Sequence, residues 1–318
     1  MAPKPQVIAL EEHYIDPEVK QHITGRDRTG GPVAARLDDV GQGRIAEMDA
    51  AGIDIQVLSH GAPSVQRLDA ELAVRLAKGA NDRLADTVRA HPDRFAAFAM
   101  LPTADPKAAA DELERAVTRL GFKGAMVHGL TGSLFLDDKR FWPIFERAQA
   151  LDVPLYLHPA IPHPAVVEAY YKDYVEKYPN LLRAAWGFTV ETATQGIRMV
   201  LSDVFDTYPR LKIILGHLGE GLPFLLWRIN MALVRDGAGP TWFRDTFCEH
   251  FWITTSGFFS DPALLCCVQE MGVDRILFSV DYPFVENAPG TEWVHRIPLC
   301  TEDKAKILNG NVKRLLKM

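Results

Sequence analysis

Acidic and histidine side chains stand at the ends of four apolar, strand-like runs in this 318-residue sequence. In chain order, these runs end at Glu11-Glu12-His13, His158, His217 and Asp281. Such residue types bind divalent metals and transfer protons near neutral pH. A single histidine in this place is ordinarily packed or hydrogen-bonded, and a single aspartate ordinarily caps a helix. Their joint appearance at matching strand ends predicts a metal site.

Two of the candidate ligands come from one strand. Glu11 and His13 are two residues apart, so on an extended strand their side chains leave the same face, whereas Glu12 points the other way. We expect His158 and Asp281 to complete the set from two other strands. Two imidazoles and two carboxylates suit Zn²⁺, Mn²⁺ or Fe²⁺, and the ligand types alone do not select among them.

Candidate acid/base and anion-binding groups follow in the segment Gly216-His217-Leu218-Gly219-Glu220 and beyond it. Glycines on both sides of His217 let the backbone approach a ligand closely. Glu220 can orient the imidazole, as an acid/base histidine requires, or it can simply complement a helix N-terminus. Arg228 is a candidate for a bidentate contact with a substrate carboxylate, Arg244 competes for that role, and a surface position is the alternative.

Eight apolar runs alternate with longer segments of helical spacing. The predicted strands are 6–13, 53–59, 94–101, 122–128, 153–158, 211–217, 250–256 and 275–281. This alternation predicts a parallel sheet covered by helices, closed as a distorted (β/α)8 TIM barrel in a single domain over residues 1–318. An open doubly wound sheet is the alternative, but it requires a glycine-rich turn where Glu11-Glu12-His13-Tyr14 stands. In a barrel, strand carboxyl ends build the active-site face.

Two segments are longer than a minimal barrel requires. One is 24–43 after the first strand, and the other lies between the fifth and sixth strands, so both are candidate lids or subunit contacts. Rim aromatic residues are candidates for walling a flat ring, with plain packing as the alternative: Tyr14, Phe258, Tyr282 and Phe284. His60 and His128, at two further strand ends, are expected on the substrate side or in a structural role.

Composition excludes several function classes. With 47% hydrophobic and 24% charged residues, the chain is an ordinary globular protein, and a net charge of -6 gives no basic surface for nucleic acid. The most apolar stretch, 211–234, contains His217, Glu220 and Arg228, all of which a membrane span would have to bury. Residues 1–5 lack a signal-peptide apolar region. The four cysteines lack C-x-x-C spacing, which favours reduced thiols in a cytoplasmic protein.

Four motifs in order resemble the amidohydrolase superfamily: Leu10-Glu11-Glu12-His13, Tyr156-Leu157-His158-Pro159, Gly216-His217-Leu218-Gly219-Glu220 and Ser279-Val280-Asp281-Tyr282-Pro283-Phe284. The chain looks most like the branch that holds aminocarboxymuconate-semialdehyde decarboxylase, γ-resorcylate decarboxylase and 2,3-dihydroxybenzoate decarboxylase. The resemblance covers essentially the whole chain. It implies one divalent ion, Zn²⁺ or Mn²⁺, held by Glu11, His13, His158 and Asp281, with His217 and Glu220 beside it.

The resemblance also implies an activity, which is the metal-dependent, non-oxidative decarboxylation of a hydroxylated aromatic acid of the dihydroxybenzoate or salicylate type. Asp281 or His217 would supply the proton, with Asp281 preferred for the ring, and Arg228 would steady the carboxylate. A homo-oligomer, dimer or tetramer, is expected. Two rivals remain open, namely a metal-dependent lactonase or amidase of the same superfamily and a catalytically inactive scaffold.

Overall fold

The computed structural model describes residues 5–318, and residues 1–4, part of the start predicted to lack a signal region, lie outside the described residues. The strands are β1 (Ile8–Tyr14), β2 (Ile55–His60), β3 (Phe95–Ala97), β4 (Ala99–Met100), β5 (Ala125–His128), β6 (Leu155–His158), β7 (Ile213–Leu215), β8 (Phe251–Thr254) and β9 (Ile276–Leu277). Neighbouring strands pair in parallel and in chain order. This order confirms the βα alternation and excludes the doubly wound alternative.

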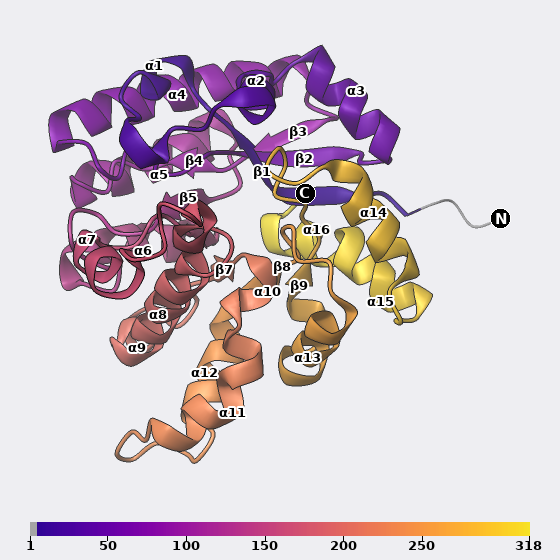
Figure 1. Ribbon diagram of the computed structural model, residues 1–318. Coiled ribbons are helices and arrows are strands. Elements are labelled where there is room, and N and C mark those ends of the chain that lie inside the picture. Colours follow the sequence, from indigo (N-terminus) through magenta and orange to yellow (C-terminus); the bar gives the residue numbers. More distant parts are fainter. Residues whose placement is uncertain (1–4) are drawn as a thin grey trace.

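The third predicted strand is divided, and the strand ladder has a second interruption between β9 and β1. Phe98 separates β3, which pairs with β2, from β4, which pairs with β5. At the other interruption, the His13 amide donates to the Tyr282 carbonyl oxygen at 2.6 Å, and the Glu11 amide donates to Ser279 Oγ at 2.8 Å. These contacts bring the last strand back to the first, as in a distorted barrel (Figure 1).

Helices surround the strands (Figure 1). In the first half these are α1 (Pro17–Lys20), α2 (Gly31–Asp38), α3 (Gln42–Ala51), α4 (Ala70–Ala90), α5 (Pro106–Leu120), α6 (Trp142–Leu151), α7 (Pro164–Val166) and α8 (Gly187–Leu201). The second half has α9 (Val204–Thr207), α10 (His217–Glu220), α11 (Leu222–Ala232), α12 (Trp242–His250), α13 (Asp261–Met271), α14 (Asn287–Arg296), α15 (Thr301–Ala305) and α16 (Asn311–Leu316).

The strands bury apolar side chains on both faces. One cluster fills the space inside the strands, with Ile8, Leu10, Val57, Phe98, Met126, Ile214 and Leu277 among its members. The alternate residues pack outward against the helices, as Ala9, Leu58 and Val127 do. In β6, where side chains alternate regularly, the inward position after Tyr156 is His158 at the carboxyl end. In β1 the register shifts between Ala9 and Glu12, and beyond this irregularity Glu11 and His13 face the site.

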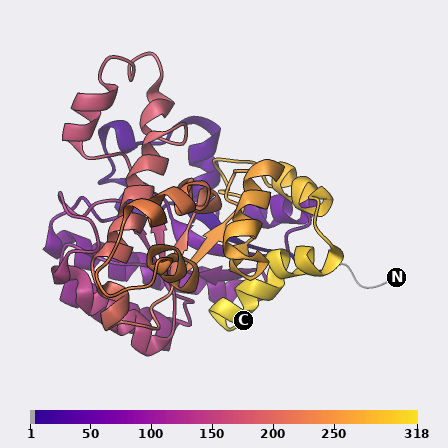
Figure 2. The same cartoon turned by 90° about the horizontal axis from the view of Figure 1, so that it is seen from below.

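Two long segments follow β1 and β6, and Figure 2 shows them next to each other on one side of the molecule. Arg26 and Glu176 form an ion pair at 2.9 Å between them. Arg67, after β2, donates to the Ile161 carbonyl oxygen at 3.0 Å. None of the helices described within residues 5–318 is both long enough and apolar enough to cross a membrane.

Candidate active site

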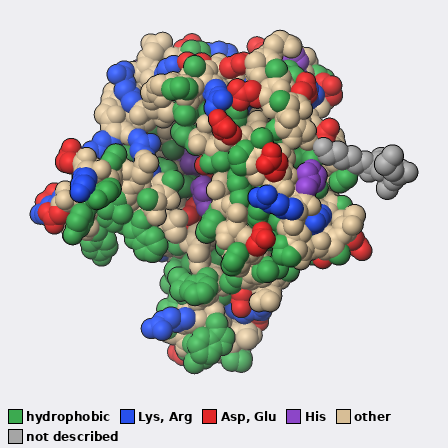
Figure 3. Space-filling view, turned by 45° about the vertical axis from the view of Figure 1, so that its right-hand side comes forward, with side chains coloured by type: hydrophobic (Ala, Val, Ile, Leu, Met, Phe, Trp, Pro, Cys, Tyr) green, Lys and Arg blue, Asp and Glu red, His purple; other side chains and the backbone are tan. Residues whose placement is uncertain are grey.

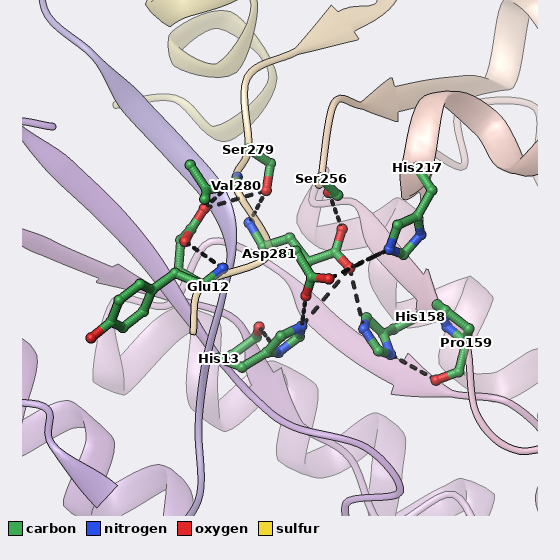
Figure 4. Close-up of polar contacts among 12 residues, drawn as sticks. Glu12, His13, His158, Pro159, His217, Ser256, Ser279, Val280 and Asp281 are labelled. Carbon is green, nitrogen blue, oxygen red and sulfur yellow. Dashed lines mark hydrogen bonds and ion pairs between the residues drawn. The ribbon is translucent and has the colours of Figure 1, made fainter. Parts of the chain in front are cut away.

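Glu11, His13, His158 and Asp281 lie together at the carboxyl ends of their strands, as predicted. Each offers one ligand atom, and these four atoms all lie within 4.8 Å of one another. His13 Nε2 is 3.4 Å from Asp281 Oδ1, and His158 Nε2 is 3.2 Å from Glu11 Oε1. Figure 4 shows the three imidazoles of His13, His158 and His217 converging beside Asp281.

Glu11 is fully buried, and its two oxygens have different surroundings. Oε2 accepts hydrogen bonds from the hydroxyls of Tyr156 and Ser256, and from Thr254 Oγ1 at 3.3 Å. Oε1 has no hydrogen-bond partner, although it is buried, and the same holds for Nε2 of His13. Buried polar atoms rarely lack a partner, so this pair of atoms fits a cation between them.

The two predicted histidine ligands turn the same nitrogen toward the cluster. His158 Nδ1 lies 2.7 Å from the Pro159 carbonyl oxygen, which can only accept, so the proton sits on Nδ1 and the Nε2 lone pair is free. His13 Nδ1 lies 3.2 Å from Ser59 Oγ. Fixing the outer nitrogen in this way orients a histidine ligand and sets its tautomer.

His217 lies beside the four ligands and is paired with Glu220, as the sequence suggested. Its Nδ1 is 2.7 Å from Glu220 Oε1, and its Nε2 is 3.8 Å from both Glu11 Oε1 and Asp281 Oδ2. His217 (φ +49°), Leu218 (φ +53°) and Glu220 (φ +55°) adopt left-handed backbone conformations within α10. This strained turn brings the imidazole and its carboxylate into one contact, which is typical of functional sites.

The electrostatics of the cluster favour positive charge at its centre. Burial lowers the pKa of His13, but the nearby carboxylates of Asp281 (3.4 Å from Nε2) and Glu11 (3.8 Å) outweigh burial and raise that pKa to about 9. Burial also lowers the pKa of His217, but Glu220, Glu11 and Asp281 raise it well above its ordinary value. For Glu11, burial raises the pKa, yet the neighbouring histidines hold it well below the usual range. Either bound protons or a divalent cation would supply the positive charge that these carboxylates favour.

The other strand-end histidines have different surroundings. His128 Nδ1 lies 3.0 Å from His158 Nδ1, so His128 contacts a predicted ligand from behind. Burial lowers the pKa of His128 well below its ordinary value, and the neighbouring histidines lower it further. His60 directs Nδ1 at the Gly61 carbonyl oxygen at 2.7 Å and packs edge-on against Tyr14. Both contacts are structural, which was one of the two roles expected for these residues.

The arginine candidates lie on exposed or half-buried helix surfaces. Arg228 is exposed on α11, and within residues 5–318 it is not among the side chains that cluster with the four ligands. Arg244 is half-buried on α12 and bonds Glu270 through Nε (3.3 Å) and Nη2 (2.7 Å, to the carbonyl oxygen). That engagement leaves Arg228 as the freer of the two guanidinium groups.

Only part of the predicted aromatic wall lies at the site. Phe284 is half-exposed, and its ring lies 5.7 Å from that of His13 in a T-shaped contact. Tyr282 is buried with its ring under the Arg44 guanidinium, and Tyr14 belongs to the outer core. Tyr14 and Tyr282 therefore serve packing, the alternative stated for them.

Sequence reasoning missed the hydroxyls that hold Glu11. Tyr156 lies two residues before His158, and Thr254 and Ser256 are likewise two apart, so strand periodicity would have placed both pairs on the inward face. Their hydroxyls leave Oε1 as the open oxygen.

The site is open to solvent on one side. The side chains of Asp281 and His217 keep 14% and 21% of their exposure, while Glu11 and His13 keep none. Figure 3 shows histidine side chains at the base of a hollow on the molecular surface. A small ligand can therefore reach the carboxylate and the imidazole directly.

This α/β barrel, with mixed carboxylate and imidazole ligands at its mouth, is the architecture of the metal-dependent amidohydrolases. The amidohydrolase family model matches residues 13–318, and the chain belongs to that family. It is 40% identical to a γ-resorcylate decarboxylase of Rhizobium sp. (strain MTP-10005) over 98% of both chains.

Solved structures with the same fold carry related names. A crystal structure of 2,6-dihydroxybenzoate decarboxylase in complex with 2,6-dihydroxybenzoate has a TM-score of 0.91, with 39% identity over 99% of this chain and all of that one. A dihydroxybenzoic acid decarboxylase from Polaromonas sp. JS666, with bound manganese and the inhibitor 2-nitroresorcinol, has a TM-score of 0.89, with 39% identity over 99% of this chain and 97% of that one.

Proposed function

We propose that the protein is a metal-dependent, non-oxidative decarboxylase of hydroxylated aromatic acids of the dihydroxybenzoate type. The proposal rests on the four-ligand cluster, in which Glu11 Oε1 and His13 Nε2 are buried and have no hydrogen-bond partner. The chain is also 40% identical to a γ-resorcylate decarboxylase over nearly its whole length. The reaction removes the carboxylate of the substrate as CO2 and leaves a phenol.

Glu11, His13, His158 and Asp281 would hold one divalent ion. When bound, that ion would supply Lewis acidity and would orient the substrate. The relative with bound manganese favours Mn²⁺ as the native metal, and Zn²⁺ is the alternative.

The protein's own groups move the proton. A proton must reach the ring carbon that bears the carboxylate, so that this carbon becomes tetrahedral. Cleavage of the bond to the carboxylate then releases CO2 and returns the electron pair to the ring. We assign the delivery of that proton to Asp281 in its protonated form, and the partial exposure of its side chain within the cluster supports this role. His217, held through Nδ1 by Glu220, directs Nε2 toward the same space and assists the substrate hydroxyl.

Arg228 is proposed to bind the substrate carboxylate, and its exposure on α11 makes this role dependent on how that helix is covered in an assembly. We further propose a homo-oligomer, dimer or tetramer. Four apolar side chains at helical spacing are strongly exposed along α11 and just beyond it: Phe224 (80%), Trp227 (70%), Met231 (63%) and Val234 (85%). Apolar stripes of this kind mark interaction surfaces.

The remaining architecture is assigned by the same reasoning. We propose that the sequence 1–318 belongs to a single domain, and that the segments after β1 and β6 are rim insertions that shape access to the site. The four cysteines are free thiols, which supports a cytoplasmic location.

A substrate panel tests the proposed function. Purified protein loaded with Mn²⁺ or Zn²⁺ is incubated with dihydroxybenzoates and salicylate, and in parallel with lactones and amides, while CO2 and phenol formation are measured. The expected result is CO2 release from at least one dihydroxybenzoate. If no hydroxybenzoate releases CO2 and a lactone or amide is hydrolysed, the site would be that of a hydrolase instead.

A further inference from the structure

Glu12 is a fully buried carboxyl that the proposed chemistry does not use. Its side chain leaves β1 on the opposite side from the ligands and faces the segment after β9 (Figure 4). Oε1 accepts from the Val280 amide at 2.9 Å, and Oε2 accepts from the Tyr282 amide at 3.2 Å. These two amides belong to the residues on either side of Asp281, so one carboxyl group accepts hydrogen bonds from the backbone on both sides of a predicted ligand.

The segment that Glu12 holds, Val280 to Tyr282, lies where the strand ladder is interrupted between β9 and β1. The ladder includes no β9–β1 pairing in the described chain, so ordinary strand hydrogen bonds do not set the distance between these two edges. The cluster nevertheless spans this gap, because Glu11 and His13 come from β1 and Asp281 comes from the segment after β9. Asp281 also has a left-handed backbone, with φ +71°, a conformation that a non-glycine residue keeps only when its surroundings hold it.

A buried polar network supports the carboxyl from behind. Gln56 Nε2 lies 3.5 Å from Glu12 Oε2 and 3.4 Å from Asn287 Oδ1. Arg44 donates through Nη1 to Gln56 Oε1 at 3.2 Å and through Nη2 to the His13 carbonyl oxygen at 2.5 Å. The network therefore ties β1, β2 and α3 to the end of the chain that carries Asp281.

We propose that Glu12 is a positioning residue, which holds the Asp281 carboxylate at the distance from His13 where the two can share one cation. The two groups are 3.4 Å apart. This inference rests on the proposed metal-dependent function, but its central measurement needs no substrate. A purely structural role for Glu12 would change stability without changing the metal affinity of the folded protein.

Glu12→Gln is the test variant. Glutamine keeps the size of the side chain but presents an NH2 group to one of the two backbone N–H donors, so one of the two hydrogen bonds to the Asp281 segment is lost. We expect Mn²⁺ affinity to fall by about 10- to 100-fold, the usual effect of losing an outer partner of a metal site. We also expect kcat to fall, with KM changed by less than about threefold.

Glu112→Gln is the matched control. Glu112 is a buried carboxylate on α5 that accepts from Asn81 Nδ2 at 2.7 Å and Arg115 Nε at 2.8 Å, away from the cluster. We expect this variant to lose thermal stability while the folded protein keeps wild-type Mn²⁺ affinity and kcat. Mn²⁺ affinity is measured by calorimetric titration, and folding by thermal unfolding, on all variants.

The outcomes separate the two proposals. Wild-type Mn²⁺ affinity and kcat in Glu12→Gln, or equal losses in Glu112→Gln, would overturn the positioning role. If Glu12→Gln does not fold, Glu12→Asp takes its place, because a carboxyl group on a side chain one methylene shorter cannot reach both the Val280 and the Tyr282 amides. A several-fold loss of Mn²⁺ affinity is then expected, and unchanged affinity overturns the role. Intact Mn²⁺ binding without decarboxylation in the wild type would refute the proposed function alone.

Discussion

Each histidine at the site has two ring nitrogens with different tasks. In His13, His158 and His217 the Nδ1 atom is engaged by Ser59, Pro159 and Glu220 respectively, and Nε2 faces the centre. The partners nevertheless differ in charge. A carbonyl or hydroxyl leaves a neutral ligand, whereas the Glu220 carboxylate favours a protonated imidazole that can exchange a proton.

This difference predicts opposite effects for two substitutions. His217→Asn should keep Mn²⁺ affinity within about threefold and lose about 10²- to 10⁴-fold in kcat, because it removes a proton-transfer group. His158→Ala should lose bound metal, because it removes a ligand. Metal analysis and turnover are measured on both variants. Wild-type turnover in His217→Asn would remove His217 from the mechanism, and full metal content in His158→Ala would remove His158 from the ligand set.

The pH dependence of metal binding follows from His13. Its pKa in the metal-free folded protein is raised from 6.5 to about 9, so its contribution to stability is fully present below pH 6.5 and is lost as the pH rises through 9. Metal must displace that proton, so Mn²⁺ affinity should rise between these pH values while metal-free stability falls. Calorimetry in buffers of different ionisation enthalpy should detect proton release at pH 7. Affinity that is flat over this window would contradict the assignment.

The sequence predicted that these four side chains lie together, because the position of a residue at a strand end and its period-two spacing depend on local order. Glu11 and His13 share a face as expected, and His158 and Asp281 join them. The arginine assignment was not resolved, because the position of Arg228 relative to the substrate depends on how an exposed helix is covered.

At the level of elements, the first residue after β7 has to be small. The Gly216 backbone passes so close to the buried ligand that a Cβ would lie 2.9 Å from Glu11 Oε2 and 3.1 Å from the Tyr156 hydroxyl. Its φ of -73° is ordinary, so the requirement is for space rather than for backbone freedom. The sequence indicated a close approach here, but it did not identify Glu11 as the group approached.

Gly216→Ala should therefore push Glu11 away from its hydroxyl partners and weaken Mn²⁺ binding by about tenfold or more. Gly239→Ala is the control, because no atom lies within 4 Å of its added Cβ. Both variants are compared by Mn²⁺ titration and thermal unfolding. Equal Mn²⁺ affinity in the two variants would show that Glu11 tolerates the displacement.

The elements themselves were predicted from apolar runs bounded by helical segments, and each run except one contains a single strand. The exception, 94–101, divides at Phe98, whose amide donates to the Leu58 carbonyl oxygen at 2.9 Å while the next amide turns to Gly124. Neither glycine nor proline marks this change of partner. It arises from tertiary pairing, which local sequence does not encode.

On the scale of the whole molecule, α11 and α12 project from the barrel (Figure 1), and hydrophobic side chains gather on this projecting end (Figure 3). Composition did not reveal this surface. The sequence pattern of an apolar helix face is the same whether the core of the protein or a second copy of the chain covers that face.

The assembly proposal predicts that Trp227→Glu, which places a charge in the exposed apolar stripe, weakens self-association by at least about tenfold. Analytical ultracentrifugation over a range of concentrations measures this. Lys107→Glu is a control, because this lysine is exposed on α5 and forms an ion pair with Asp111 of the same helix. A wild-type monomer at all concentrations, or an unchanged assembly in Trp227→Glu, would contradict the assignment of this surface.

The proposed reaction replaces the carboxylate of an aromatic acid by a proton. The most direct measurement is mass spectrometry of the product formed from 2,6-dihydroxybenzoate by the Mn²⁺-loaded protein in D2O, with CO2 measured in the same vessel. We predict one CO2 for each resorcinol formed and one solvent-derived deuterium on the ring carbon that lost the carboxylate. Intact 2,6-dihydroxybenzoate after prolonged incubation with fully metal-loaded, folded protein, together with no CO2 release from any other dihydroxybenzoate, would contradict the proposed decarboxylation.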